Sequence, residues 1–208
     1  MKTKKIFLFL LLMITGIFTA NAQLAIFGIR AGANMATISG AGNIYDNSNL
    51  KLGSSFAAMV GYKLNNAWSL FGELGFEQKG YRDPGSNNSN TARTIRRCDY
   101  LTVPIALKGI YPVKDKLSIY GELGPYNAFL VKSSYDETRN GENILSNNSD
   151  PNIKGNDFGW WIGGGFEIPV AAKKLNLDIR YSRGIMEVDK VNSELRNKSL
   201  SLSLGFWF

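Results

Sequence analysis

Apolar and polar residues alternate along most of the chain beyond residue 23, with the period of two that a strand with two different faces produces. Residues 200–208 are the clearest case, because every even position is apolar, whereas the odd positions from 199 to 205 are serine or glycine. The pattern predicts an all-β protein. Its eight predicted strands are 27–35, 56–64, 68–77, 101–108, 117–123, 158–168, 175–182 and 198–208.

The lengths of these segments and of their connections favour a membrane. Strands of soluble proteins average about five or six residues, whereas a tilted strand that crosses a bilayer needs about 9–11. Short turns alternate with long polar loops, as in transmembrane barrels. We therefore expect one eight-stranded, antiparallel, up-and-down transmembrane β-barrel, with both termini at the end that carries the turns. The predicted turns are 65–66, 112–115 and 171–173, and the predicted loops are 39–51, 80–97, 132–156 and 187–197.

Residues 1–22 have the organisation of a secretory signal peptide. Three lysines lie among the first five residues, an apolar run follows from 6 to 18, and Ala20 and Ala22 supply small residues at the spacing of a cleavage site. We predict cleavage before Gln23, which leaves residues 23–208 as the barrel domain. Loss of the three lysines lowers the net charge from +7 to +4, and this removes most of the support for nucleic-acid binding.

If the apolar parity of each strand faces outward, the other parity faces the lumen and brings several charged residues into it. An eight-stranded barrel is about wide enough for side chains to fill. We predict that these charges form a salt-bridged network that plugs the lumen, because an unpaired ion there would be strongly destabilising. An ion gate or a small polar-ligand site is the alternative. The predicted network consists of Arg30, Lys63, Glu73, Glu77, Lys108, Glu122, Glu167, Asp178 and Arg180.

A near-repeat of seven residues supports this arrangement. Residues 69–75 (SLFGELG) recur as residues 118–124 (SIYGELG), and each copy follows a short predicted turn. Each copy therefore predicts an outward-running strand with one glutamate opposite its apolar residues. Glu73 and Glu122 are expected at a similar depth in the lumen.

The composition argues against an enzyme. The chain has no histidine and one cysteine, which excludes histidine-based catalysis, histidine-ligated metals and an intramolecular disulfide. We predict no catalytic residue, no cofactor and no metal. Arg96 and Arg97 lie beside Cys98 and would lower its pKa, but an inert thiol is the interpretation that we favour. The mean hydropathy of −0.13 does not argue for a soluble protein, because alternating residues cancel in an average.

Three short motifs resemble a known family. They are residues 28–34 (GIRAGAN), residues 100–108 (YLTVPIALK) and the C-terminal residues 205–208 (GFWF). They are similar to small outer-membrane β-barrel proteins of Gram-negative bacteria, of the porin-family or PorT-like type. The resemblance implies a barrel that is integral to the outer membrane and implies no catalytic residue. It also implies that Phe208 is part of the signal that the barrel-assembly machinery reads during insertion.

The predicted function is that of an integral outer-membrane barrel with a structural or surface-interaction role. Its predicted partners are outer-membrane lipid and, during insertion, the assembly machinery, and we expect a monomer. One alternative is a narrow porin-like channel or small polar-solute carrier that uses the lumen charges. Another is a soluble, secreted, lipocalin-like binder, in which the apolar residues would face inward and the charges outward.

Overall fold

The computed structural model describes residues 25–40, 50–83, 93–114, 116–139, 142–171, 173–190 and 195–208, so the predicted signal peptide lies outside the described residues. In the described part of the chain, no helix is long and apolar enough to cross a membrane. The regular structure there consists of strands. They are β1 (Ala25–Ser39), β2 (Lys51–Lys63), β3 (Trp68–Asp83), β4 (Arg93–Lys114), β5 (Leu117–Arg139), β6 (Glu142–Ser149), β7 (Asn156–Val170), β8 (Lys173–Gly184) and β9 (Arg196–Trp207).

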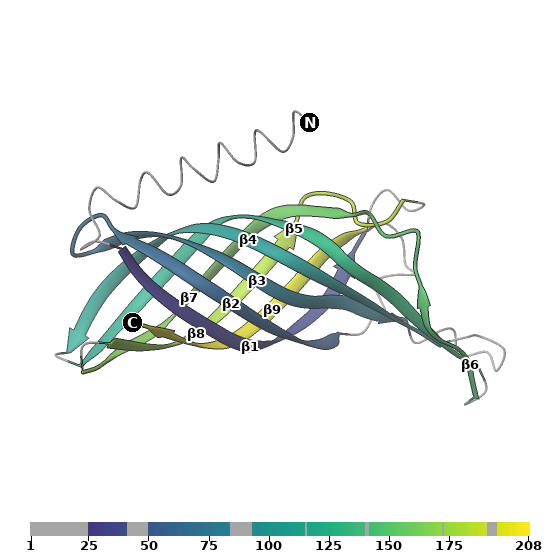
Figure 1. Cartoon of the computed structure of the whole chain (residues 1–208), viewed down its shortest axis with the longest axis horizontal. Coiled ribbons are helices and arrows are strands. Elements are labelled where there is room, and N and C mark those ends of the chain that lie inside the picture. Colours follow the sequence, from purple (N-terminus) through teal and green to yellow (C-terminus); the bar gives the residue numbers. More distant parts are fainter. Residues whose placement is uncertain are drawn as a thin grey trace.

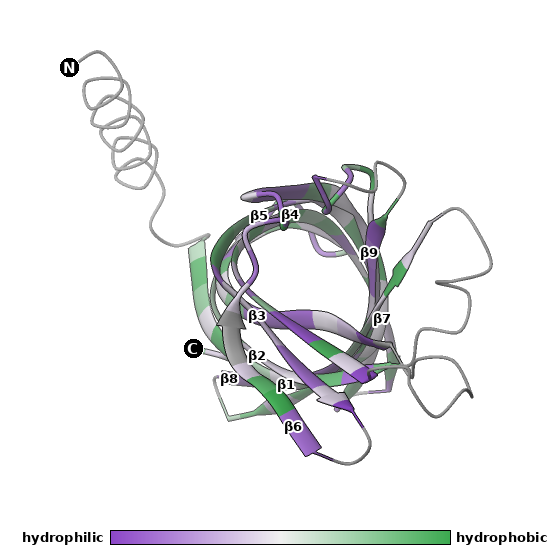
Figure 2. Cartoon of the chain, turned by 90° about the vertical axis from the view of Figure 1, so that its right-hand side faces the viewer, coloured by the Kyte–Doolittle hydropathy of each residue, from purple (hydrophilic) through white to green (hydrophobic). Residues whose placement is uncertain are grey.

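All strands except β6 form a closed ring of antiparallel neighbours (Figure 1). Each strand of the ring pairs with the next one along the chain, and β5 pairs with both β4 and β7. The first and last strands close the sheet, through partners that run from Gly28↔Trp207 to Ser39↔Arg196. Figure 2 shows this ring in a view along its axis. The predicted eight-stranded, up-and-down antiparallel barrel is therefore confirmed.

Tight connections join the strands at one end of the barrel, which we call the turn end. They lie between β2 and β3 (residues 64–67), between β4 and β5, and between β7 and β8. In the first of them, the Oδ1 atom of Asn65 accepts hydrogen bonds from the backbone N–H groups of Ala67 (2.8 Å) and Trp68 (2.9 Å), which fixes the turn without a glycine. The C-terminus lies at this end, as predicted, and β6 lies at the opposite end, which we call the loop end (Figure 1).

Several strands extend further than the sequence predicts. β3 continues to Asp83, and the ladder between β4 and β5 continues to the pair Arg93↔Thr138, so the predicted loops 80–97 and 132–156 are partly strand. Hydropathy alternation marks only strands that have one apolar and one polar face, and these extensions are largely polar on both. β6 pairs only with the end of β5 and stands outside the ring.

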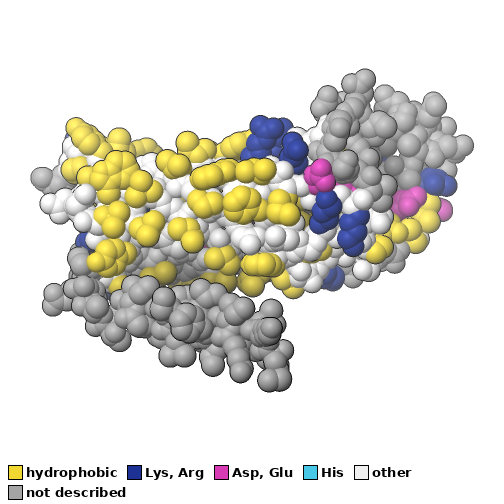
Figure 3. Space-filling view, turned by 90° about the horizontal axis from the view of Figure 1, so that it is seen from above, with side chains coloured by type: hydrophobic (Ala, Val, Ile, Leu, Met, Phe, Trp, Pro, Cys, Tyr) yellow, Lys and Arg dark blue, Asp and Glu magenta, His cyan; other side chains and the backbone are white. Residues whose placement is uncertain are grey.

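The apolar parity of the ring strands faces outward. On β9, Leu202 and Leu204 are 57% and 56% exposed, whereas Ser203 between them is 2% exposed. Figure 3 shows the apolar side chains as a band along the visible face of the barrel. On β1 the band runs from Phe27 to Met35, which matches the roughly 9–11 residues that a tilted strand needs to cross a bilayer. This arrangement is the reverse of the one that a lipocalin-like binder requires.

Four prolines of the described residues lie inside paired strands, and two of them, Pro104 and Pro125, are well away from the strand ends. Pro104 lies on β4 opposite Tyr126, and Pro125 lies on β5 opposite Trp160 of β7. The register between β4 and β5 is the same on both sides of Pro125, so this proline does not cause a bulge. The register shifts of this ladder lie elsewhere, at Val131 between the pairs Asp99↔Lys132 and Tyr100↔Leu130, and between Pro112 and Lys114. At Pro104 and Pro125 the backbone stays extended, so the missing N–H donor interrupts the hydrogen bonds there without shifting the ladder.

Candidate functional site: the barrel lumen

Five charged side chains from four strands meet in the centre of the lumen, and we call them the central cluster. Arg180 on β8 lies 2.8 Å (Nη1) from Oε1 of Glu73 on β3 and 2.6 Å (Nε) from Oε1 of Glu122 on β5. Asp178 lies 3.1 Å (Oδ1) from the same Nε atom. Arg30 on β1 contacts Glu73 at 2.5 Å and Asp178 at 3.6 Å. Two cations therefore compensate three carboxylates.

Neighbouring polar and aromatic side chains hold the central cluster in place. Asp178 accepts hydrogen bonds of 3.0 Å from the Oγ of Ser203 and from the Nδ2 of Asn176. The guanidinium of Arg180 lies 4.3 Å from the ring centroid of Trp161, which in turn packs edge-on against Phe71 with 5.9 Å between centroids. A cation over an aromatic face gains further stabilisation when both are shielded from water.

A second group, the turn-end cluster, surrounds a buried ion pair near the turn end. The Nζ of Lys108 lies 2.7 Å from Oε2 of Glu167, and Lys174 contacts the other oxygen of the same carboxylate. The ammonium of Lys108 also lies 3.8 Å from the ring centroid of Tyr120 and 5.9 Å from that of Trp207. Trp207 is buried and faces inward, so it helps to fill this end of the lumen.

A third group, the loop-end cluster, surrounds Lys79, which is only 1% exposed. Its Nζ lies 3.5 Å from Oε2 of Glu77 and 3.6 Å from Oδ2 of Asp157, and 4.4 Å from the ring centroid of Tyr126. Asp157 also accepts hydrogen bonds from the hydroxyl of Tyr126 (3.1 Å) and from the Nδ2 of Asn197 (2.9 Å). The ammonium group of Lys79 therefore links β3, β5 and β7 near the loop end of the lumen.

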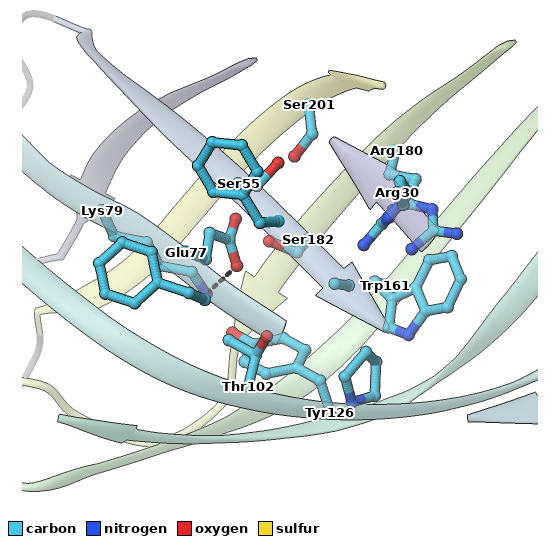
Figure 4. A pocket seen from close by; sticks show the side chains of 14 residues that line it. Arg30, Ser55, Glu77, Lys79, Thr102, Tyr126, Trp161, Arg180, Ser182 and Ser201 are labelled. Atoms are coloured by element: carbon cyan, nitrogen blue, oxygen red, sulfur yellow. Dashed lines mark ion pairs between the residues drawn. The ribbon is translucent and has the colours of Figure 1, made fainter. Parts of the chain in front are cut away.

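A cavity of about 50 Å³, lined by both polar and apolar side chains, separates the central and loop-end clusters. Figure 4 shows Glu77 and Lys79 on one side of it, and Arg30, Arg180 and Trp161 on the other. Such a volume holds roughly three to five water molecules, which hydroxyl groups in the wall can bind. The hydroxyl-bearing residues of the wall are Ser55, Thr102, Tyr126, Ser182 and Ser201.

Two loop segments at the loop end, 150–155 and 185–190, pair with each other, and we call them the loop cap. The backbone N–H of Lys154 donates to the carbonyl of Val188 (2.8 Å). Arg96 on β4 ties both segments to the barrel, because its Nη1 lies 3.1 Å from Asp150 and 3.4 Å from Asp189. Ile153 is buried and packs into the same apolar cluster as side chains of the lumen. The loop cap is thus anchored by both charge and apolar contact.

Cys98 lies three residues beyond the end of the apolar band on β4, on the loop-end side. Its side chain is buried, and this burial, together with the nearby Asp150 carboxylate, raises the pKa of the thiol to about 12. Arg96 acts in the opposite direction but does not outweigh the loss of solvation. The pKa therefore moves opposite to the direction that the flanking arginines suggested, and this favours an unreactive thiol at neutral pH.

Eight of the nine residues predicted for the lumen network lie in the three clusters. Lys63 is the correction, because it is the last residue of β2 and its side chain is exposed at the turn end. Sequence reasoning missed Lys79 and Asp157, because one predicted strand ends at residue 77 and the other begins at residue 158. Lys79 and Asp157 lie on the same inward-facing alternation as Glu77 and Trp161. Continuing the alternation just beyond the predicted strand ends would therefore have placed both residues in the lumen.

The ring of strands, the apolar outer band and the ion-paired interior together define a β-barrel that spans a membrane. Residues 21–190 match the family described as "Outer membrane protein beta-barrel domain". The chain belongs to this family and is an integral outer-membrane protein in contact with the lipid of that membrane. The narrower PorT-like resemblance stays a prediction. No curated protein matches the chain.

Several solved structures are similar to this chain. Ail, the attachment invasion locus protein of Yersinia pestis, is 15% identical, with a TM-score of 0.42 over 89% of this chain and 100% of that one. Neisserial surface protein A is 16% identical, with a TM-score of 0.44 over 86% and 95%. OprG of Pseudomonas aeruginosa is 10% identical, with a TM-score of 0.45 over 89% and 96%.

Proposed function

We propose that this protein is a closed outer-membrane barrel with a structural or surface-interaction role, and that its lumen does not conduct. The observation that carries the proposal is the order of clusters along the lumen. The turn-end, central and loop-end clusters follow one another, and the cavity between the last two has only about 50 Å³. Long side chains such as Arg180 and Lys79 are each fixed by carboxylates from more than one strand, which favours a rigid plug.

Conductance in planar bilayers tests this proposal. Refolded wild-type protein is expected to give no current steps, because moving an ion through the lumen would require breaking several buried ion pairs at once. The variants Arg30→Gln and Glu122→Gln, which each remove one charge from the central cluster, are expected to stay silent if packing alone suffices to close the lumen. Current that appears only in these variants would assign the closure to the ion pairs.

The alternative function is a narrow channel or small polar-solute carrier. The cavity between the central and loop-end clusters supports it, because hydroxyl groups and Glu77 form part of the wall of a space that water can fill. A wild-type current whose ion selectivity changes in Arg30→Gln or Glu122→Gln would favour the channel and refute the closed barrel.

Support for a surface role comes from the loop end. β4 and β5 have 22 and 23 residues, about twice the length that crosses a bilayer, so their paired polar ends project beyond the apolar band. β6 extends this projecting sheet by one strand, next to the loop cap. A sheet edge outside the membrane is a surface on which another molecule can pair or pack.

Excision of β6 tests whether this projection is independent of the barrel. Replacing Glu142–Ser149 with a short glycine-serine linker is expected to change the free energy of unfolding by less than about 1 kcal/mol, because β6 pairs only with the end of β5. Urea unfolding and heat-modifiable gel migration measure the effect. Removal of an equal length of β5 within the ring is the control and is expected to abolish folding. A loss above about 2 kcal/mol for the β6 variant would make β6 part of the folding unit.

Export and assembly complete the proposal. Residues 1–22 are proposed as a cleaved signal peptide and Phe208 as part of the insertion signal for the assembly machinery. A monomeric state is proposed because the ring closes within one chain.

A further inference from the structure

Three basic side chains lie together on the outer surface of β8 and β9, immediately beyond the apolar band at the loop end. Arg183 and Lys198 are direct cross-strand partners, and Arg196 follows Lys198 on the same face of β9. The residues two positions nearer the membrane on these strands are Tyr181 and Leu200, which are 41% and 37% exposed and belong to the band. We call the three cations the basic triad.

The basic triad has no acidic partner among the described residues. None of its members takes part in an ion pair there, whereas Arg97, on the outer face of β4, contacts Asp136 at 2.5 Å. The cross-strand neighbours of the triad on β1 and β7 are uncharged, namely Thr37, Ser39 and Trp160. Like charges directly opposite each other destabilise a sheet, so Arg183 and Lys198 repel unless an anion lies between them.

The level of the triad indicates where that anion comes from. Trp160, which pairs with Arg183, is 52% exposed, and exposed tryptophans are typical of the interface where lipid headgroups lie. A lipid whose anionic headgroup is bound there would have its acyl chains beside Tyr181 and Leu200. Lysine and arginine close to a membrane surface each attract anionic headgroups by about 1 kcal/mol, and arginine binds phosphate through two parallel hydrogen bonds.

We propose that the basic triad binds the phosphate groups of a phosphorylated lipid in the leaflet at the loop end, which is the outer leaflet because transmembrane barrels have their short turns in the periplasm and their longer loops outside. Arg183 and Lys198 hold one phosphate between them from opposite strands, and Arg196 lies one step further out, where a second phosphate of the same headgroup can reach it. The bound lipid offsets the repulsion within the triad and fixes the depth of the barrel in the membrane.

Binding of diphosphoryl lipid A to detergent-solubilised barrel, measured by native mass spectrometry, tests the proposal. The variant Arg183→Gln/Arg196→Gln/Lys198→Gln is expected to bind roughly tenfold more weakly than the wild type or worse. The matched control is Lys63→Gln/Lys114→Gln/Lys116→Gln, which removes three exposed cations at the turn end and is expected to stay within about twofold. Heat-modifiable migration verifies that each variant folds, and the single variant Arg183→Gln, with an expected loss of about threefold, serves if the triple variant does not.

Two further measurements distinguish lipid binding at the basic triad from non-specific electrostatic attraction and from binding of free phosphate. Arg183→Lys/Arg196→Lys keeps the charge and is expected to keep most of the affinity. Inorganic phosphate at the same concentration is expected not to displace the lipid, because it lacks the chains that rest on the apolar band. Equal binding by the triple variant and the wild type, equal losses in the triple variant and its control, or displacement by inorganic phosphate would each overturn the proposal.

Discussion

Replacement of Arg180 by methionine is expected to lower the free energy of unfolding of the barrel by about 3–5 kcal/mol. Methionine keeps much of the length of the side chain but removes the only cation in contact with Glu122 among the described residues. Glu73 and Asp178 would then share Arg30 alone. A buried carboxylate has lost its hydration whether or not it is paired. Leaving it without a cation therefore destabilises the barrel by far more than the intact ion pair stabilised it. Urea unfolding in lipid vesicles, followed by tryptophan fluorescence, measures the change.

A second substitution distinguishes charge from packing. Adding Glu122→Gln to Arg180→Met removes the carboxylate that lost its partner, so the double variant is expected to recover about 1–3 kcal/mol of the loss. Lys63→Met is the matched control, because Lys63 is exposed and its loss is expected to cost less than about 0.5 kcal/mol. If Arg180→Met is no less stable than this control, the central cluster does not stabilise the barrel.

Replacement of Leu204 by arginine is expected to cost about 2–4 kcal/mol in a bilayer. Leu204 lies in the middle of the apolar stretch of β9, between Leu200 and Phe208, and its side chain is 56% exposed on the outer face. There a guanidinium meets hydrocarbon, and it must either lose its hydration or thin the surrounding membrane. Unfolding by urea in phosphatidylcholine vesicles measures the cost.

The same substitution near the edge of the band provides the control. Leu52 is 67% exposed and pairs with Met35 at the loop end of the band, so Leu52→Arg is expected to cost only about 0–1 kcal/mol. The difference between the two positions is the result that matters, because a surface in contact with water would tolerate arginine equally at both. Equal costs at Leu204 and Leu52 would contradict the position of the bilayer that the apolar band defines.

The sequence alone predicted the ring and its two faces. The alternation at residues 200–208 fixes which parity of β9 is apolar, and the same local signal exists on every ring strand. The near-repeat was equally informative, since Glu73 and Glu122 were expected at similar depth and both contact the guanidinium of Arg180. The prediction of the barrel fold succeeded because the side chains of a strand alternate with a period of two whatever their partners are.

Tertiary structure decided which lumen charges meet. Glu122 is the cross-strand partner of Lys108, yet it pairs with Arg180, whereas Lys108 contacts Glu167. Such choices depend on the tilt of the strands and on the register between distant segments, which no local pattern contains. The paired loop cap and the buried Cys98 were beyond local reasoning for the same reason, whereas the extensions of β4 and β5 were missed because they are largely polar on both faces. Local alternation therefore determined the fold and its outward face, while closure of the sheet decided the contacts inside the lumen and the cross-strand partners on its surface.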